Sequence, residues 1–246
     1  MKKLLKRLFA QCGFSLHRLP RGLVTGADLA RDLRIVVGGR SRPCCIDAGA
    51  NDGGTINLLR QCLVAPRIHA FEPNPATFAI LQANHRATPD VKLNHAGLGD
   101  APGTLTLQVF ANHALNSFLP LTSHGRVRLD SNDAPQTVSV PVLRLDDYAA
   151  QEKLDDIDLL KVDTQGFELH VFRGAEAKFA ARRIRAVLVE LNFADLYVGQ
   201  AAPAEVIAFL HARGLRLVDF YEKCRHNPVL GWCTALFART DQPPAP

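Results

Sequence analysis

Residues 44–54 have the sequence Cys-Cys-Ile-Asp-Ala-Gly-Ala-Asn-Asp-Gly-Gly, in which an apolar run ends in a carboxylate and a glycine-rich turn. This pattern predicts a buried strand that passes through a tight turn into a helix. Gly49 and Gly53 permit the positive φ angles of such a turn, and their missing Cβ atoms let a ligand approach the main chain. Asp47 ends the strand and offers a hydrogen-bond acceptor beside the turn. We therefore expect a nucleotide-like ligand here, although this stretch alone does not say which.

A second carboxylate follows the next expected strand. Residues 67–71 form a largely apolar run that leads into Glu72-Pro73, and an acid about 20 residues after the first glycine turn is typical of one that binds ribose hydroxyls. A dinucleotide fold would prefer Gly-x-Gly-x-x-Gly, so that a pyrophosphate lies on bare helix amides, whereas residue 51 is asparagine and Asp47 would repel a diphosphate. A sulfonium cation with an amino-acid tail would not be repelled. These observations favour an adenosine-containing cation and leave an NAD-dependent oxidoreductase as the alternative.

Several further motifs follow in a fixed order. After Asp47–Gly53 and Phe71-Glu72-Pro73 come Leu-Lys-Val-Asp-Thr-Gln-Gly-Phe-Glu at residues 160–168 and then Arg173-Gly174-Ala175. In these motifs the chain resembles the FkbM-type methyltransferase family over roughly residues 44–240, and several motifs in register are far more specific than any one of them. The resemblance implies S-adenosylmethionine as the cofactor and O-methylation of a sugar or polyketide hydroxyl. The chain departs from the family's usual pattern at Gln165, where glutamate is common.

Strands and helices alternate along most of the chain, which predicts an α/β fold with a mostly parallel, twisted sheet and helices on both of its faces. The resemblance implies that this is the Rossmann-like fold of class I methyltransferases, with an antiparallel last strand. Residues 100–145 interrupt the alternation and predict a β-rich insertion. The expected strands include Val91–Ala96, Thr104–Val109, Thr137–Leu143, Ile157–Val162, Ile184–Leu191, Leu215–Tyr221 and Trp232–Ala238, and the expected helices are Thr55–Leu63, Pro75–Ala87 capped by Asn74, Glu168–Ala181, and one from Pro203 to Gly214.

Length and composition predict one main domain, because 246 residues of which 47% are hydrophobic suffice for a single large core. We expect a basic helical segment over residues 1–40, a methyltransferase domain over 41–240 and a disordered tail over 241–246. Residues 1–22 contain six Lys and Arg and no acid, so they could contact anionic lipid or lipid-linked glycan, or pack their leucines on the domain. Their apolar run is shorter than a signal peptide or a membrane span requires. Because the six cysteines form no regular framework, we expect a cytoplasmic protein, or one at the inner face of the membrane.

The expected site follows from the fold, because ligands of open α/β sheets bind beyond the carboxyl ends of the strands, where the strand order reverses. A base is needed to remove a proton from an alcohol, and for this role Asp163 is preferred over Glu190, His113 and His124. Lys161 and Asp163 could instead form a buried ion pair that holds the central strand. Resemblance and position assign the S-adenosylmethionine contacts to Asp47, Gly49, Asn51, Gly53, Glu72, Pro73, Gly99 and Asp100, with the adenine near residues 97–100, and the catalytic roles to Asp163, Lys161 and Glu190.

Side chains with oxygen atoms that could bind a hard metal ion lie at the ends of two neighbouring expected strands. Asp163 ends one of these strands, and Glu190 and Asn192 end the other. Their placement resembles the magnesium site of catechol O-methyltransferase, so a divalent metal is an alternative, but hydrogen bonding would also explain these residues and we do not expect a metal. The expected partner is a small-molecule or glycan acceptor. Nucleic acid is not expected, because the sequence has no Asn-Pro-Pro-Tyr-type motif and no basic-aromatic stripe. The non-enzymatic alternative is an adenosine-binding or membrane-surface adaptor without turnover.

Overall fold

The computed structural model of the chain describes residues 9, 11, 24–131, 134–226 and 228–240. Most of the basic segment that begins at residue 1, and the whole tail over residues 241–246, lie outside the described residues, so both expectations stay predictions. Within the described part of the chain, no helix combines the length and the apolar composition that crossing a membrane would require.

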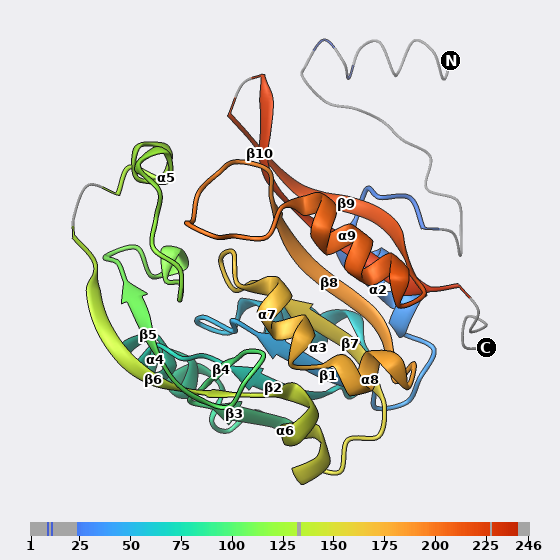
Figure 1. Ribbon diagram of the computed structural model, residues 1–246. Helices are drawn as coiled ribbons and strands as arrows, with labels where there is room; N and C mark the ends of the chain where they lie inside the picture. The colour runs from blue at the N-terminus through green and yellow to red at the C-terminus, as the bar shows by residue number, and fades with distance from the viewer. Residues whose placement is uncertain (1–8, 10, 12–23, 132–133, 227, 241–246) are drawn as a thin grey trace.

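A seven-stranded sheet in the order β3-β2-β1-β7-β8-β10-β9 forms the centre of the molecule (Figure 1). All neighbouring strands from β3 to β8 pair in parallel, whereas β10 is antiparallel to both β8 and β9. The strands are β1 Cys44–Ala48, β2 Arg67–Phe71, β3 Val91–Asn94, β7 Ile157–Val162, β8 Ile184–Asn192, β9 Leu215–His226 and β10 Val229–Arg239. The predicted fold, including its antiparallel last strand, is therefore confirmed, and the strand order reverses between β1 and β7.

Two hydrophobic cores cover the two faces of this sheet. Alternating side chains of β1 divide between them, because successive residues of a strand point to opposite faces: Cys44 and Ile46 lie in one core and Cys45 in the other. The first core packs on α6 Leu145–Gln151, α7 Glu168–Arg173, α8 Glu176–Ala180 and α9 Pro203–Ala212, and the second on α2 Leu29–Val37, α3 Gly54–Cys62 and α4 Pro75–His85. Burial on both faces explains why the parallel strands are apolar throughout rather than alternating.

Two helix predictions differ in outcome. Helix α4 begins as expected, because the Asn74 side chain accepts a hydrogen bond from the Ala76 amide and Pro75 occupies the first turn. The single helix expected over residues 168–181 is instead two short helices that are separated at Gly174 and Ala175. A Cβ atom at Gly174 would lie only 2.0 Å from the carbonyl oxygen of Gly99. The chain breaks its helix where it passes this close to the strand-end segment.

The predicted β-rich insertion is present and stands over the carboxyl ends of the central strands (Figure 1). Its strands β4 Gly97–Leu98, β5 Gly103–Val109 and β6 Gln136–Leu143 form a separate sheet in the order β4-β6-β5, and the short helices η1 His113–Leu115 and α5 Ser123–Arg128 lie between β5 and β6.

Backbone hydrogen bonds join the insertion to the loop that follows β8. The amide of Thr122 donates to the carbonyl of Leu196 over 2.8 Å, and the amide of Val198 donates to the carbonyl of Pro120 over 2.8 Å. A third apolar cluster, which includes Leu121 and Tyr197, fills the space between these two segments. The insertion and the loop after β8 therefore form one continuous wall.

Candidate active site

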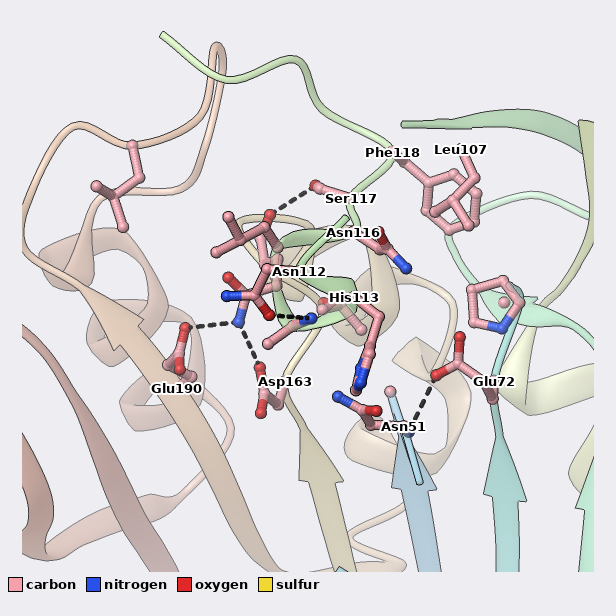
Figure 2. A pocket seen from close by; sticks show the side chains of 18 of the residues that line it. Asn51, Glu72, Leu107, Asn112, His113, Asn116, Ser117, Phe118, Asp163 and Glu190 are labelled. Carbon is pink, nitrogen blue, oxygen red and sulfur yellow. Dashed lines mark hydrogen bonds between the residues drawn. The ribbon is translucent and has the colours of Figure 1, made fainter. Parts of the chain in front are cut away.

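A cavity of about 350 Å³ lies between the carboxyl ends of the central strands and the insertion (Figure 2). Asn51, Glu72, Asp163 and Glu190, which follow or end β1, β2, β7 and β8, form its floor, and residues 112–118 form its roof. The cavity is therefore at the place in the sheet where the fold predicts a ligand.

Glu72 is the buried carboxylate of this floor, with 6% of its surface exposed. Its Oε2 accepts a hydrogen bond from the Asn51 amide over 3.0 Å, and its Oε1 accepts one from the Asn74 amide over 2.9 Å. A carboxylate offers about four acceptor positions, so Glu72 can hold the glycine turn in place and still accept two ligand hydroxyls. Burial raises the pKa of Glu72, and the two amide hydrogen bonds oppose this shift.

The glycine turn brings the main chain of β1 against the end of β7. Gly49 has a φ of 83°, and a Cβ atom on it would lie 1.9 Å from the carbonyl oxygen of Asp163, so only glycine fits. Gly53 has a φ of 99°, and its Cβ would lie 2.1 Å from the ring of His85. Gly49 lines the cavity, as does Pro73, whereas Gly53 packs against α4 and does not reach the cavity. The cofactor contact expected for Gly53 stays a prediction, and the role that the structure shows for Gly53 is in shaping the turn.

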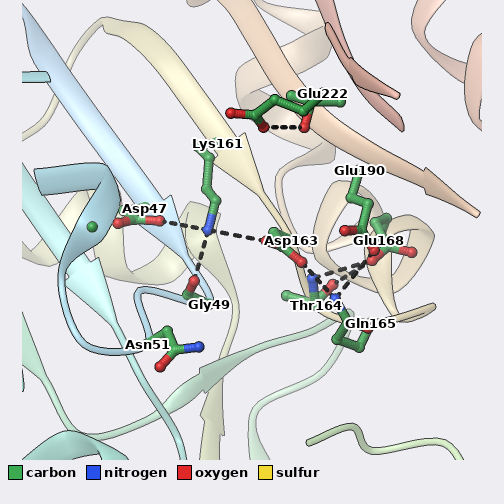
Figure 3. A network of polar contacts seen from close by, with 12 residues as sticks. Asp47, Gly49, Asn51, Lys161, Asp163, Thr164, Gln165, Glu168, Glu190 and Glu222 are labelled. Carbon is green, nitrogen blue, oxygen red and sulfur yellow. Dashed lines mark hydrogen bonds and ion pairs between the residues drawn. The ribbon is translucent and has the colours of Figure 1, made fainter. Parts of the chain in front are cut away.

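Asp47 is fully buried and does not line the cavity. It faces Lys161, whose Nζ lies 3.1 Å from Asp47 Oδ1 and 3.8 Å from Asp163 Oδ2, and donates a hydrogen bond to the carbonyl of Gly49 over 2.7 Å (Figure 3). Burial alone would lower the pKa of Lys161, but Asp47 and Asp163 outweigh it and raise that pKa.

This geometry bears on the roles expected for Asp47 and Lys161, which stay predictions. Asp47 lies apart from the cavity that Glu72 lines, because its position on β1 is opposite Lys161 on β7 and the two side chains pair. Lys161 also stays outside this cavity and acts on it through the Gly49 carbonyl that it holds. The buried ion pair considered for Lys161 is present, with Asp47 as its nearer partner.

The expected adenine segment reaches the cavity only in part. Gly97 and Leu98 line it, but Gly99 and Asp100 do not. Gly99 lies against the side chains of Val142 and Phe167, and Asp100 faces His170 instead, with 3.0 Å between Oδ2 and Nδ1. The cofactor contacts expected for Gly99 and Asp100 stay predictions, and in the structure the chain leaves the cavity after Leu98.

Gln165 joins the two carboxylates on the other side of the floor. Its Nε2 donates to Asp163 Oδ1 over 2.9 Å and to Glu190 Oε1 over 3.1 Å (Figure 3). The hydroxyl of Tyr197 donates to Gln165 Oε1 over 2.8 Å, which fixes the orientation of the amide. Burial raises the pKa of Glu190 well above its ordinary value, and the charges of Asp163 and Glu168 add to this shift. Glu190 thus holds a proton more tightly than an ordinary glutamate does, and it lies beside a second acid.

The same contacts occupy one of the two oxygens with which Glu190 could bind a cation. This oxygen accepts hydrogens from two amides, those of Gln165 and of Asn192 at 3.2 Å. Across residues 24–131, 134–226 and 228–240, no group of three or more His, Cys, Asp and Glu side chains is arranged to hold a metal.

The two histidines considered as bases lie in different places. His113 belongs to η1 and lines the cavity roof. His124 lies on α5 outside the cavity, where its Nε2 accepts a hydrogen bond from Arg128 Nε over 2.9 Å.

Glu168 holds the loop after β7 from below. Its Oε1 accepts hydrogen bonds from the amides of Thr164 and Gly166 over 3.1 and 3.0 Å, and from the Thr164 hydroxyl over 3.3 Å (Figure 3). Burial raises the pKa of Glu168 from its ordinary 4.5 to about 7, despite these hydrogen bonds. A single oxygen accepts all three, so a neutral side chain of the same shape can keep them.

Glu168→Gln is expected to remove a pH dependence of stability. Because the folded-state pKa is raised, the native protein binds the extra proton, and its stability falls as the pH rises from about 4.5 to 7, by about 3 kcal/mol for this group. Urea unfolding at pH 5 and pH 8 should therefore show the variant gaining about that much relative to the wild type at the higher pH. An equal difference at both pH values would contradict the role of Glu168.

Some cavity residues were not among the expected site residues. Gln165 was visible only as a departure from the family pattern, and Asn116, Leu196 and Trp232 gave no local signal. Trp232 reaches the cavity because β10 pairs with β8, which places Trp232 opposite Asn192, the last residue of β8. Knowledge of the strand register would have been needed to find it.

Fold and site together define a class: Rossmann-like proteins whose sheet, glycine turn and acid after β2 are those of class I methyltransferases. Residues 47–217 match the family described as the Methyltransferase FkbM domain, and the chain belongs to this family.

Individual relatives agree with this assignment. The chain is 27% identical over 64% of its length to the 2-O-methyltransferase NoeI of Sinorhizobium fredii, and 27% identical over 70% of its length to the 31-O-demethyl-FK506 methyltransferase FkbM of Streptomyces tacrolimicus. These alignments cover 67% and 72% of the relatives, and the chain spans about two thirds of the length of the curated relatives it matches. A crystal structure of a methyltransferase FkbM from Methylobacillus flagellatus is similar with a TM-score of 0.49 and 16% identity, over 80% of this chain and 43% of that chain.

Proposed function

We propose that the protein is an S-adenosylmethionine-dependent methyltransferase that methylates a hydroxyl of a sugar, a glycan or a small-molecule natural product. One observation supports this most directly: a single cavity joins Glu72 and the glycine turn to the carboxylates of Asp163 and Glu190. Two relatives whose names specify O-methylation support the choice of a hydroxyl.

The residues on one side of the cavity fit the adenosine part of this cofactor. Glu72 offers acceptors for ribose hydroxyls, and the side chains of Leu98, Leu107 and Phe118 offer an apolar surface for a flat base. The buried Oδ1 of Asn51 has no hydrogen-bond partner among the described residues and can accept one from the ligand. When bound, the cofactor supplies an electrophilic methyl group on a sulfonium.

The residues on the other side fit the demands of methyl transfer. The protein must align the acceptor oxygen with the S-methyl axis, and proximity and orientation of this kind can supply on the order of 7–11 kcal/mol. It must also take a proton from the alcohol. We assign this role to Glu190 rather than Asp163, because burial raises the pKa of Glu190, whereas Asp163 already pairs with the Lys161 ammonium at 3.8 Å.

The NAD-dependent alternative is disfavoured by the first turn of α3. The Gly54 amide, which would have to bind a pyrophosphate, donates instead to Asp52 Oδ1 over 3.2 Å. A diphosphate there would meet this carboxylate.

Calorimetry separates the alternatives. Titration with S-adenosylhomocysteine is expected to show binding, and the same titration with NADH is not. A folded protein that binds NADH, or that binds neither ligand, would overturn the proposal. A protein that binds S-adenosylhomocysteine but forms no product from any acceptor pool would indicate the adaptor alternative.

Glu72→Ala is expected to weaken S-adenosylhomocysteine binding by roughly 10- to 150-fold, because a hydrogen bond to a charged group contributes about 1.5–3 kcal/mol. Calorimetry of the variant beside Glu205→Ala provides the comparison. Glu205 caps α9 through the Ala202 amide and lies outside the cavity, so its removal should leave the affinity unchanged. Equal affinity in Glu72→Ala and the wild type would exclude Glu72 from the ligand site.

We also propose that the protein works in the cytoplasm on an acceptor other than nucleic acid. The five described cysteines are free thiols, which suits a reducing compartment.

A further inference from the structure

We propose that the acceptor is an uncharged compound with two adjacent hydroxyls next to an apolar group, and that Asn192 positions it by accepting a hydrogen bond from the hydroxyl beside the reacting one. This inference rests on the proposed function and specifies its substrate class. It depends on three properties of the cavity wall around Glu190, namely its charge, its apolar surface and one buried oxygen.

The charged groups that line the cavity are almost all acidic. They are Glu72, Asp163, Glu190 and the titratable His113, and no Lys or Arg of the described residues lines it. Lys161 lies below the floor, where it pairs with Asp47 and holds the Gly49 carbonyl. An acceptor that brought a carboxylate or phosphate near Glu190 would lose its hydration without gaining a cation from the residues that line the cavity.

Part of the cavity wall is apolar. Leu115 and Leu196 belong to a buried cluster against which Leu129 and Trp232 pack, and all four line the cavity. A ligand group placed against these side chains is removed from water on an apolar surface, which is how small-molecule sites gain affinity. A fully hydrated acceptor such as a free sugar has no apolar group that could cover this surface.

Asn192 provides the polar contact between the acids and the apolar wall. It is only 4% exposed, and its Oδ1 has no hydrogen-bond partner among the described residues. Its Nδ2 donates to Glu190 Oε1 over 3.2 Å, which directs Oδ1 away from Glu190. The register of β8 and β10 places Asn192 directly opposite Trp232. A buried oxygen without a partner is rare in folded proteins and points to a ligand donor.

The number of protons decides which hydroxyl Asn192 contacts. An alcohol has one O–H hydrogen, and in the reacting hydroxyl this hydrogen goes to Glu190 as the oxygen forms its bond to the methyl carbon and the carbon–sulfur bond breaks. Asn192 Oδ1 must therefore accept from a different hydroxyl. Because the other atom of the same amide contacts Glu190, we expect the two hydroxyls to lie close together, as they do on adjacent carbons of a ring.

Fluorescence of Trp232, the single tryptophan of the chain, measures entry into this part of the cavity. The probes are hexyl β-D-glucopyranoside, hexyl β-D-glucuronide and glucose, each titrated into protein saturated with S-adenosylhomocysteine. We expect a saturable change with the hexyl glucoside, and half-saturation at concentrations at least tenfold higher for the charged glucuronide and for glucose. Equal or tighter binding of the glucuronide, or no saturable change with the glucoside, would overturn the inference.

Asn192→Ala tests the positioning role. It is expected to raise the half-saturation concentration of the hexyl glucoside roughly 2- to 10-fold, the effect of one neutral hydrogen bond, with the affinity for S-adenosylhomocysteine unchanged. The matched control is Asn94→Ala, because Asn94 also ends a strand but lies outside the cavity. Equal effects of both variants on glucoside binding would refute the role of Asn192.

The outcomes separate the two proposals. Failure to bind S-adenosylhomocysteine would refute the proposed function itself. Cofactor binding together with preference for the charged or fully hydrated probe would refute only the acceptor class. The comparison of the three probes uses the unaltered protein, so it holds even where Asn192→Ala does not fold.

Discussion

Asp47→Asn is expected to destabilise the fold by about 3–5 kcal/mol, the cost of leaving one member of a buried ion pair without its partner. The Lys161 ammonium would keep only the more distant Asp163, at 3.8 Å, and the Gly49 carbonyl. Urea unfolding at neutral pH measures this loss directly. The glycine turn should also loosen, since Lys161 holds the Gly49 carbonyl from below.

Two comparisons identify the cause of such a loss. Asp195→Asn makes the same chemical change in an exposed residue of the loop after β8 and should alter stability by less than about 0.5 kcal/mol. The double variant Asp47→Asn with Lys161→Met removes both charges and should recover part of the loss, because a buried pair can be replaced at little cost when both members go. A double variant less stable than Asp47→Asn alone would show that Lys161 acts mainly through Gly49.

Glu190→Gln is expected to lower kcat by about 10²- to 10⁴-fold, the usual contribution of a general base. The amide keeps the shape of the side chain but cannot accept the proton of the acceptor. Affinity for S-adenosylhomocysteine should stay the same, because Glu190 lies on the opposite side of the cavity from Glu72 (Figure 2). Turnover with saturating cofactor and any acceptor identified by mass spectrometry measures the effect.

The pH profile distinguishes a base from a merely structural residue. A base must be deprotonated, so wild-type turnover should fall as the pH is lowered through the raised pKa of Glu190. Glu190→Gln should lose this acidic limb together with its activity. Glu222→Gln is the matched control, because Glu222 hydrogen-bonds to Thr234 Oγ1 over 2.9 Å outside this cavity. A larger loss in Asp163→Asn than in Glu190→Gln would assign the base to Asp163 instead.

The sheet could be predicted from the sequence because its signals are local. An apolar run, a glycine turn and an acid identify the ends of β1 and β2 within a few residues, and Asn74 with Pro75 identifies the start of α4. The break in the helix expected over residues 168–181 could not be predicted in this way. It arises from the close approach of Gly174 to Gly99, which are far apart in the chain.

The location of the site could be predicted from the sequence, but only some of the contacts within it could. Glu72 and Asn51 line the cavity because they directly follow strand ends. Asp47 also ends a strand, yet its side chain points below the turn, and only the register of β1 with β7 shows that it faces Lys161. Gln165 joins Asp163, Glu190 and Tyr197 from three separate segments. Such contacts need the tertiary arrangement, which neither periodicity nor spacing encodes.

The hydrogen bonds between Thr122 and Leu196, and between Val198 and Pro120, have a consequence for engineering. Substrate range in such enzymes is an attractive target for recombination, and residues 103–143 look like a cassette that could be exchanged alone. If these residues were exchanged without the loop after β8, the backbone amides and carbonyls that join the two segments would lose their hydrogen-bond partners. A chimaera with new selectivity will have to inherit both segments from the same parent.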